Sequence, residues 1–336
     1  MSKNCHLSSI DRAIISTLTY SQVKRWPMTL WEIFRYLTNP QRIGEQILLK
    51  KIGLYEIQKR VKRLIKIGII KEEEGFYSLK QRKLKSAPFL RRNSKDKLTD
   101  SKIKKAIKIT KYLQFLPFIR GIFLSGSLIF GWANEESDID ILIVAQSNHL
   151  WTARFLISAL LTVARLKRSK QHIKDRLCLN HFITNGVSEI PLYSFYNAET
   201  YARIIPLYGE KTIFNNFLKA NLWINNYIMW GSGKYHEDLR QISNSQCKKL
   251  FKSLLEILLN IIGAGQILEK LLCQWQIKRI KKDPLTYKKG GRVVVDTRQI
   301  EFHPDSPERE HLRQYNKQLA SLNLFDFNRE RDSGLV

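Results

Sequence analysis

The sequence predicts an α+β fold, with a small mixed sheet between two largely helical regions, and three patterns carry this prediction. Apolar residues recur at helical spacing over residues 8–66 and again over residues 191–283. Between these regions, residues 138–144 alternate polar and apolar side chains with the period of a β-strand. Near the C-terminus, two Val- or Ile-containing runs on either side of Asp296 and Thr297 predict a β-hairpin.

The N-terminal 80 residues have the pattern of a winged helix, which is three helices followed by a hairpin. The expected elements are helices over 8–19, 29–37 and 54–64 and strands over 69–71 and 76–79. Ser8 or Ser9 is expected to cap the first helix, and Thr29 forms a capping box with Glu32 at the start of the second. Gly68 is expected to end the third helix before the hairpin.

The third of these helices has a basic polar face, which raises the question of DNA binding. In a DNA-binding winged helix it would enter the major groove, and Lys59, Arg60 and Arg63 would contact phosphates. The expected tip of the hairpin is Glu72-Glu73-Glu74, which would repel the duplex backbone. The alternative is a winged helix that serves as a structural or protein-docking module, and the sequence leaves both open.

The composition divides the chain into five expected parts. They are a winged-helix-like domain over 1–82, a linker over 83–100, a core over 101–190, a helical domain over 191–287, and a hairpin, helix and loose tail over 288–336. The linker is expected because its residues are polar and basic and contain a proline. Helices are expected over 101–115, 149–166, 193–205, 211–229, 245–282 with a break near Gly263, and 308–322.

The most informative stretch lies near the middle of the chain. Residues 121–124 predict a short strand, and Gly126 with Ser127 then begins a short helical turn that admits a phosphate close to its backbone N–H groups. Asp138 and Asp140 follow on the next predicted strand, and residues two apart leave a strand on the same face. Two adjacent carboxylates on an apolar strand predict a site for a hard divalent cation, Mg²⁺ above all.

This stretch resembles the nucleotidyltransferase signature of the DNA-polymerase-β-like superfamily, which is a Gly-Ser pair, a spacer and then Asp-x-Asp. The residues in register with small bacterial members of that superfamily are Gly126, Ser127, Gly131, Ser137, Asp138 and Asp140. With the N-terminal winged helix and the Val-rich hairpin ending in Phe-His-Pro, most of the chain looks like a bacterial nucleotidyltransferase-domain protein. The implied fold is a winged helix, a small mixed-sheet nucleotidyltransferase core and a mostly helical C-terminal region with a hairpin.

The resemblance also implies an activity and a set of ligands. Asp138 and Asp140 would be catalytic and would bind Mg²⁺ or Mn²⁺, while Gly126 and Ser127 would hold the phosphates of an NTP, ATP first among the candidates. Gly131, Ser137 and Asn180 are further candidates for nucleotide binding. A nucleoside monophosphate would pass to a hydroxyl group with release of pyrophosphate. The acceptor is open between a protein side chain, a small molecule and an RNA end.

Two positions depart from the superfamily pattern. Phe130 stands where those members often carry an arginine. The strand expected over 177–183 has no acid where a third carboxylate is usual, and Asn180 or His181 occupies that region; Asp175 and Glu189 are substitutes from flanking loops. The alternative to an enzyme is therefore a catalytically weak or inactive nucleotide-binding regulator that uses its winged helix for DNA or protein.

Composition argues against several other classes of protein. Four widely spaced cysteines without a Cys-x-x-Cys pair argue against a zinc site or a disulfide framework and fit the cytoplasm. The apolar region 254–273 is interrupted by charged residues, so stable membrane insertion is not expected. The net charge of +27 fits polyanionic partners or a basic solvated surface. Aromatic residues over 193–230 are expected in the core, or else stacked on a base.

Overall fold

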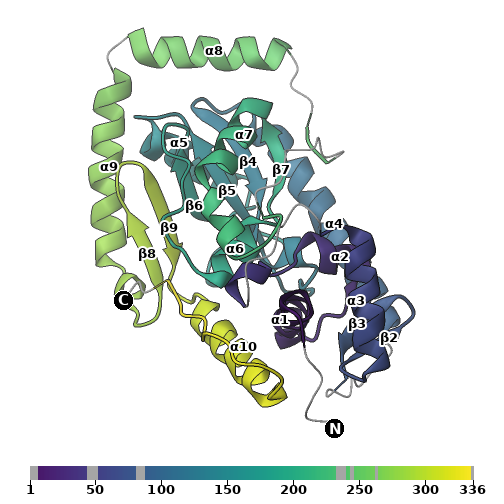
Figure 1. Cartoon of the computed structure of the whole chain (residues 1–336). Helices are drawn as coiled ribbons and strands as arrows, with labels where there is room; N and C mark the ends of the chain where they lie inside the picture. Colours follow the sequence, from purple (N-terminus) through teal and green to yellow (C-terminus); the bar gives the residue numbers. More distant parts are fainter. Residues whose placement is uncertain are drawn as a thin grey trace.

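The computed structural model describes residues 7–43, 52–80, 88–231, 240–242, 246–261 and 264–333. Within this part of the chain, one six-stranded sheet lies at the centre, and the N-terminal helices and a small three-stranded sheet gather at one end of it (Figure 1). The molecule is thus a mixed α+β protein, as the sequence predicts.

The central sheet combines strands from distant parts of the chain. Its order is β7-β4-β5-β6-β9-β8. These strands are Ile205–Gly209, Ile119–Leu124, Ile139–Ala145, Leu177–Thr184, Gln299–His303 and Arg292–Val295. Among the described strands, β5 and β6 alone pair in parallel, through a crossover that contains helix α5 (Leu150–Val163), and the other pairs are antiparallel.

Each face of the sheet is buried under its own set of helices. Ile139, Ile141 and Ile143 of β5 belong to the cluster that includes α5 and helix α4 (Pro88–Leu113), against which α9 (Ala264–Lys282) also packs. On the other face the buried side chains pack against α6 (Phe195–Tyr201), α7 (Lys211–Ala220) and the N-terminal helices. The period-two pattern of β5 is therefore real, and it directs its aspartates away from α5.

The N-terminal elements follow the predicted order closely. They are α1 (Ser9–Val23), β1 (Met28–Thr29), α2 (Leu30–Arg35), α3 (Leu54–Lys66), β2 (Ile70–Glu73) and β3 (Phe76–Leu79). The Oγ of Ser8 accepts from the backbone of Asp11, and Thr29 does the same with Glu32, so both caps are capping boxes. Helix α1 is buried nearly throughout because α10 (Glu308–Leu322) covers its other side.

Two segments have a different secondary structure from the one that the sequence predicts. Residues 193–205 were predicted to be helical, but the helix is only α6, and Ile205–Gly209 forms edge strand β7 against β4. Pro206 is tolerated there because an edge strand leaves one side unpaired. Helix α4 begins at Pro88, inside the predicted linker, because no glycine or proline interrupts the residues from 89 to 116. Residues 83–87 of that linker lie outside the described part.

The C-terminal half differs from the prediction in three further places. The helix expected over 211–229 ends at Ala220 and continues as a 3-10 turn over Leu222–Asn226. The hairpin β8–β9 is part of the central sheet, since β9 pairs with β6, so the expected division at 287 and 288 cuts through one sheet. The tail was expected to be loose, but its described part, up to residue 333, contacts the rest of the molecule. Glu330 pairs with Arg42, and Phe325 and Phe327 pack against the core.

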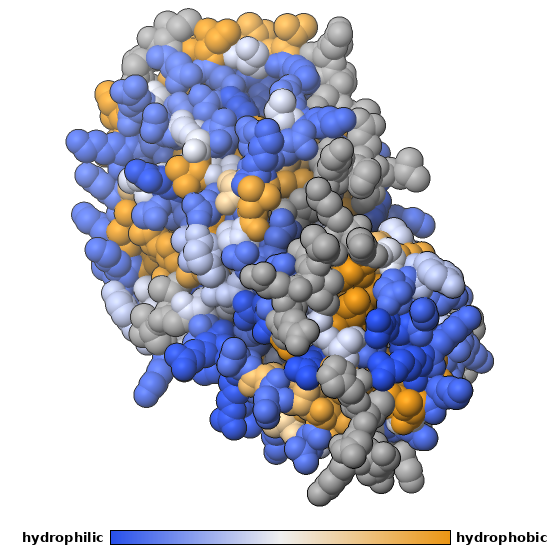
Figure 2. Space-filling view, in the orientation of Figure 1, coloured by the Kyte–Doolittle hydropathy of each residue, from blue (hydrophilic) through white to orange (hydrophobic). Residues whose placement is uncertain are grey.

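Helices α8 (Gln246–Ile261) and α9 lie along two outer sides of the molecule (Figure 1). Residue 263, near which a break was predicted, lies outside the described residues. Apolar side chains of α8 are exposed along the upper edge in Figure 2. Among the described helices, no single one is long and apolar enough to cross a membrane; α8 and α9 together pass that test by length and composition, with an 85° bend between them.

Gly131 is expected to tolerate alanine less well than Gly75, although both have positive φ (+71° and +79°). A Cβ on Gly131 would lie 2.6 Å from the ring of Trp26, whereas nothing lies within 4 Å of one on Gly75. Gly75→Ala should cost about 1–2 kcal/mol of backbone strain, and Gly131→Ala should cost about 1–3 kcal/mol more from the clash. Urea unfolding of both variants measures the difference, and equal losses would contradict it.

Candidate functional site

Asp138 and Asp140 meet the Gly126 turn because β4 and β5 are antiparallel neighbours. The backbone N–H of Ser125 donates to the carbonyl of Asp140 at 3.0 Å, and the chain then enters a 3-10 turn over Gly126–Phe130. Gly126 has φ +68°, and a Cβ there would lie 2.0 Å from Oδ2 of Asp140. Any side chain at this position would therefore fill the space beside the carboxylate, which explains the glycine.

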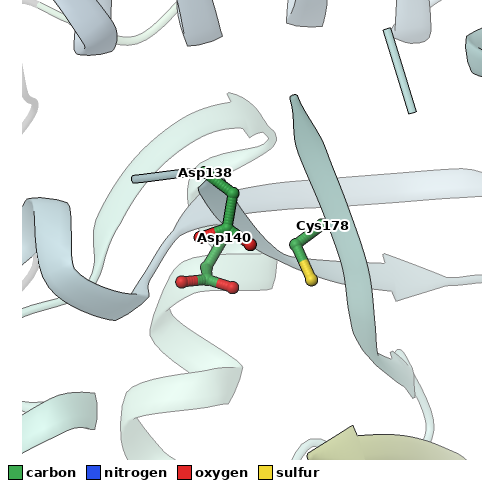
Figure 3. A group of neighbouring side chains, drawn as sticks. All are labelled: Asp138, Asp140 and Cys178. Atoms are coloured by element: carbon green, nitrogen blue, oxygen red, sulfur yellow. The ribbon is translucent and has the colours of Figure 1, made fainter. Parts of the chain in front are cut away.

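Asp138, Asp140 and Cys178 point into one space (Figure 3), and one potential ligand atom from each lies within 4.8 Å of the others. Cys178 is brought there by β6, in register with Asp140. Burial raises the pKa of the Cys178 thiol, and the charges of Asp140 and Asp138 raise it further. The sulfur is therefore a neutral thiol, which leaves the two carboxylates as the ligands for a hard cation.

The two carboxylates repel each other and are compensated by neighbouring cationic and amide groups. Partial burial raises the pKa of Asp140 well above its usual range, and the charge of Asp138 adds to this. Nη1 of Arg168 lies 3.0 Å from Oδ2 of Asp138 and donates to Sγ of Cys178 at 3.3 Å. Nδ2 of Asn180 donates to Oδ1 of Asp140 at 3.0 Å. A guanidinium thus supplies the positive charge that the pair requires.

The residues fit a divalent cation such as Mg²⁺ or Mn²⁺. Oδ2 of Asp138 is buried without an aligned hydrogen bond, and the charge that compensates it is that of Arg168. Mg²⁺ is usually held by one or two carboxylates, with water and phosphate oxygens completing its coordination. Asp138 and Asp140 would hold it, and a bound cation would neutralise phosphate charge beside Gly126.

A cavity of about 400 Å³ surrounds the two carboxylates, within the range of small-molecule sites. Of the sequence-predicted residues, its walls contain Gly126, Ser127, Ser137, Asp138, Asp140, Asn180 and His181. Ser137 also organises the preceding loop, since its Oγ accepts from the backbone N–H of Asn134 at 2.9 Å. Gly131 is not in this wall. It ends the 3-10 turn with a left-handed conformation against Trp26.

Phe130 and Trp132 supply a stacked aromatic pair to the same cavity, with ring centroids 4.1 Å apart. The guanidinium of Arg203 lies 4.9 Å from the centre of the Phe130 ring. Tyr196 and Tyr201 also reach the wall, whereas Phe214 and Phe217 are core residues. The aromatic region thus contributes to both the core and the cavity.

The expected substitutes for a third carboxylate are engaged elsewhere. Asp175 pairs with Lys102 and Lys105, and Glu189 accepts from the hydroxyl of Tyr193. Neither lines the cavity. Asn180 takes the place on β6 facing Asp140, and it cannot accept a proton as a base does. His181 is bonded to Tyr201 and Gln299, and burial lowers its pKa to about 4, so it is a neutral structural residue.

Sequence reasoning missed three contributors to the site, namely Cys178, Arg168 and His303. His303 lies beside the pair because β9 joins β6, and its Nδ1 is 3.2 Å from Nδ2 of Asn180. Burial lowers its pKa to about 3, and the charge of Arg292 acts in the same direction, so the imidazole is neutral. The basic run at 167–174 and the Phe-His-Pro sequence were visible signals, but neither identifies which side chain turns inward.

Asp140→Asn is expected to flatten part of the pH dependence of stability in protein free of divalent cations. Between the usual Asp range and its raised pKa, folded Asp140 keeps a proton that the unfolded chain releases, so the free energy of unfolding falls as pH rises, by about 1.4 kcal/mol per pH unit. The variant should gain stability over the wild type with rising pH.

The measurement is chemical unfolding of both proteins from pH 4 to 8, taken as a difference so that other titrating groups cancel. Millimolar Mg²⁺ should stabilise the wild type at pH 8 and leave Asp140→Asn nearly unchanged. A difference that does not vary with pH would contradict the raised pKa.

Similarity to known proteins does not identify the function of this site. Comparisons of the chain with protein-family models, with curated proteins and with solved structures find no match. The chemistry of the cavity therefore rests on its own residues: two carboxylates, a glycine turn and an aromatic wall.

Proposed function

We propose that this protein is an Mg²⁺-dependent nucleotidyltransferase, with a winged helix at its N-terminus and a nucleotidyltransferase core built on the central sheet. One observation carries the proposal: Asp138 and Asp140 face the same cavity as a glycine turn that approaches Asp140 so closely that a Cβ on Gly126 would lie 2.0 Å from Oδ2. A site for a cation beside a site for phosphate is what transfer from an NTP requires.

The residues divide the work of the reaction. Asp138 and Asp140 would hold the cation, and Gly126 with Ser127 would receive the β- and γ-phosphates, which would bring the α-phosphorus to the carboxylates. Arg168, which pairs with Asp138, would be available to the phosphates as a counter-charge once a cation is bound. Phe130, Trp132 and Tyr196 supply apolar and aromatic surface for the base of ATP or another NTP.

In the transfer step, the oxygen of an acceptor hydroxyl bonds to the α-phosphorus as the bond to the bridging oxygen of the β-phosphate breaks. Pyrophosphate leaves, and the hydroxyl proton passes to water, since among the described residues of β6 no carboxylate faces the pair. Positioning and electrostatic stabilisation then supply the rate enhancement. The acceptor is a protein side chain, a small molecule or an RNA end.

Incubation of the protein with α-labelled or γ-labelled NTP, Mg²⁺ and cell extract tests the activity. Label should transfer from the α-position alone, with release of pyrophosphate, and Asp138→Asn or Asp140→Asn should reduce it by about 100-fold or more. Asp326→Asn, which changes an exposed carboxylate outside the cavity, is the matched control. Transfer from the γ-position, or equal rates in all variants, would contradict the proposal.

A nucleotide-binding regulator is the second candidate, because Asn180 replaces an acid and Arg168 occupies the cation position. On α3, Arg63 pairs with buried Asp11 at 2.6 Å, and Arg60 lies 3.7 Å from the same carboxylate. These two arginines stabilise the fold, so of the three residues predicted to contact DNA only Lys59 is fully exposed. Lys62 and Lys66 are exposed beside it and complete a basic surface.

Replacing Lys59, Lys62 and Lys66 by alanine tests DNA binding without disturbing Asp11. If the surface binds duplex DNA, affinity should fall and the slope of log K against log salt should shrink by about 3. The same change at Lys104, Lys108 and Lys111 of α4 is the control, since these lysines are also exposed. Identical binding curves for the two triple variants in a fluorescence anisotropy titration would remove α3 as a DNA reader.

A further inference from the structure

A second cavity lies between α5 and α9, on the face of the sheet opposite to the two aspartates. Its volume is about 500 Å³, larger than that around Asp138 and Asp140. Its lining includes Arg154, Phe155 and Lys167 from one side and Trp275 and Arg279 from the other. It shares no lining residue with the aspartate cavity, so the proposed transferase activity does not explain its chemistry.

Three cations converge on this cavity, and within the described part of the chain none of them forms an ion pair. Nη1 of Arg154 donates to Oε1 of Gln276 at 2.6 Å, but its Nε is buried without a hydrogen-bond partner. Lys167 donates only to the hydroxyl of Ser158, and Arg279 lies 6.0 Å from the centre of the Trp275 ring. An unsatisfied guanidinium N–H beside two like charges is unfavourable unless an anion joins them.

The pKa values of these groups reflect the same excess of positive charge. Burial lowers the pKa of Arg154 to about 10, and the charge of Arg279 acts in the same direction. Burial also lowers the pKa of Lys167, with Arg154 and Arg279 contributing. Asp283 stands at the wall, but its Oδ1 accepts from the backbone N–H of Leu285 at 3.0 Å and caps the following turn. Asp283 is one carboxylate against three cations, so the lining of the cavity keeps an excess of positive charge.

Aromatic surface adjoins the cations. Phe155 and Trp275 meet edge to face with ring centroids 6.2 Å apart, and both are substantially exposed, at 37% and 50%. A purely solvated basic face would have no reason to present two large aromatic rings beside a buried guanidinium. Their combination matches a ligand with an anionic end and a planar or apolar body.

We propose that the α5–α9 cavity binds a small phosphate monoester carrying a planar or apolar group, with its phosphate among Arg154, Lys167 and Arg279 and its body against Phe155 and Trp275. The volume is within the range of sites that enclose such molecules. Arg154 has the central role, since its Nε offers the donor that the phosphate satisfies. This site is a binding site only, and no reaction is assigned to it.

Calorimetric titration of the whole protein with phenyl phosphate, inorganic phosphate and phenol, in buffer free of divalent cations, tests the site. Phenyl phosphate should bind more tightly than inorganic phosphate, and phenol should not bind. Arg154→Gln should weaken phenyl phosphate by about tenfold or more, as expected for the loss of a charge-assisted hydrogen bond. Arg165→Gln, an exposed arginine outside the cavity, should bind as the wild type does.

Arg279→Gln keeps the test decisive if Arg154→Gln does not fold, because Arg279 is exposed and its replacement leaves the packing in place. This variant should also bind phenyl phosphate several-fold more weakly than the wild type does. Unchanged affinity in the folded variants would overturn the proposal. So would binding of a 5′-phosphorylated oligonucleotide with no binding of phenyl phosphate, since the ligand would then be a polymer. If Asp140→Asn still binds phenyl phosphate, the α5–α9 site is independent of the proposed transferase site.

Discussion

Strand β5 has to satisfy two environments at once, and the rest of the molecule depends on how it does so. Ile139, Ile141 and Ile143 anchor the sheet to α4 and α5 by burial, which fixes the register of the strand. The opposite face begins with two carboxylates and becomes apolar only at Leu142 and Val144. A slip of one residue would bury the aspartates under α5, so the apolar face holds the polar face in place. Burial of apolar side chains on both faces of the sheet therefore stabilises the position of the site.

A buried ion network secures the other wall of the aspartate cavity. Arg292 of β8 pairs with Glu301 of β9 and with Glu308 at the start of α10, and it donates to Asn197 of α6 at 2.6 Å. Both carboxylates are almost fully buried, so removing Arg292 would leave them uncompensated. Because these partners come from separate segments, the network joins the C-terminal hairpin and helix to the sheet. The pairing of β9 with β6 also brings His303 beside Asn180.

Local signals in the sequence predicted what local physics decides. The capping boxes at Ser8 and Thr29, the alternation of β5 and the bounds of α10 depend on residues a few positions apart. Strand β7 was missed because Ile205–Gly209 has no alternation of its own and pairs only with distant β4. That Asp138 and Asp140 lie side by side follows from strand geometry. Their partners Arg168 and Cys178 depend on the crossover from β5 to β6, and His303 depends on the pairing of β9 with β6, so no local pattern predicts them. The helix expected over 101–115 is the second half of α4, and its first half, from Pro88, was missed because a polar sequence is compatible with helix once other elements cover one side of it.

Lys167 and Arg168 are successive residues that serve different cavities, on opposite faces of the sheet. Their backbone is tethered on both sides: the N–H of Lys167 donates to the carbonyl of Leu161 at 3.1 Å, and that of Arg168 donates to Leu177 at 2.9 Å. The backbone between the two side chains is thus tied to α5 and β6, whatever either side chain binds. The positive charges of the two side chains lie on opposite faces of the sheet at successive residues, so a charge bound in one cavity can act on the other through the electrostatic potential without a displacement of the chain.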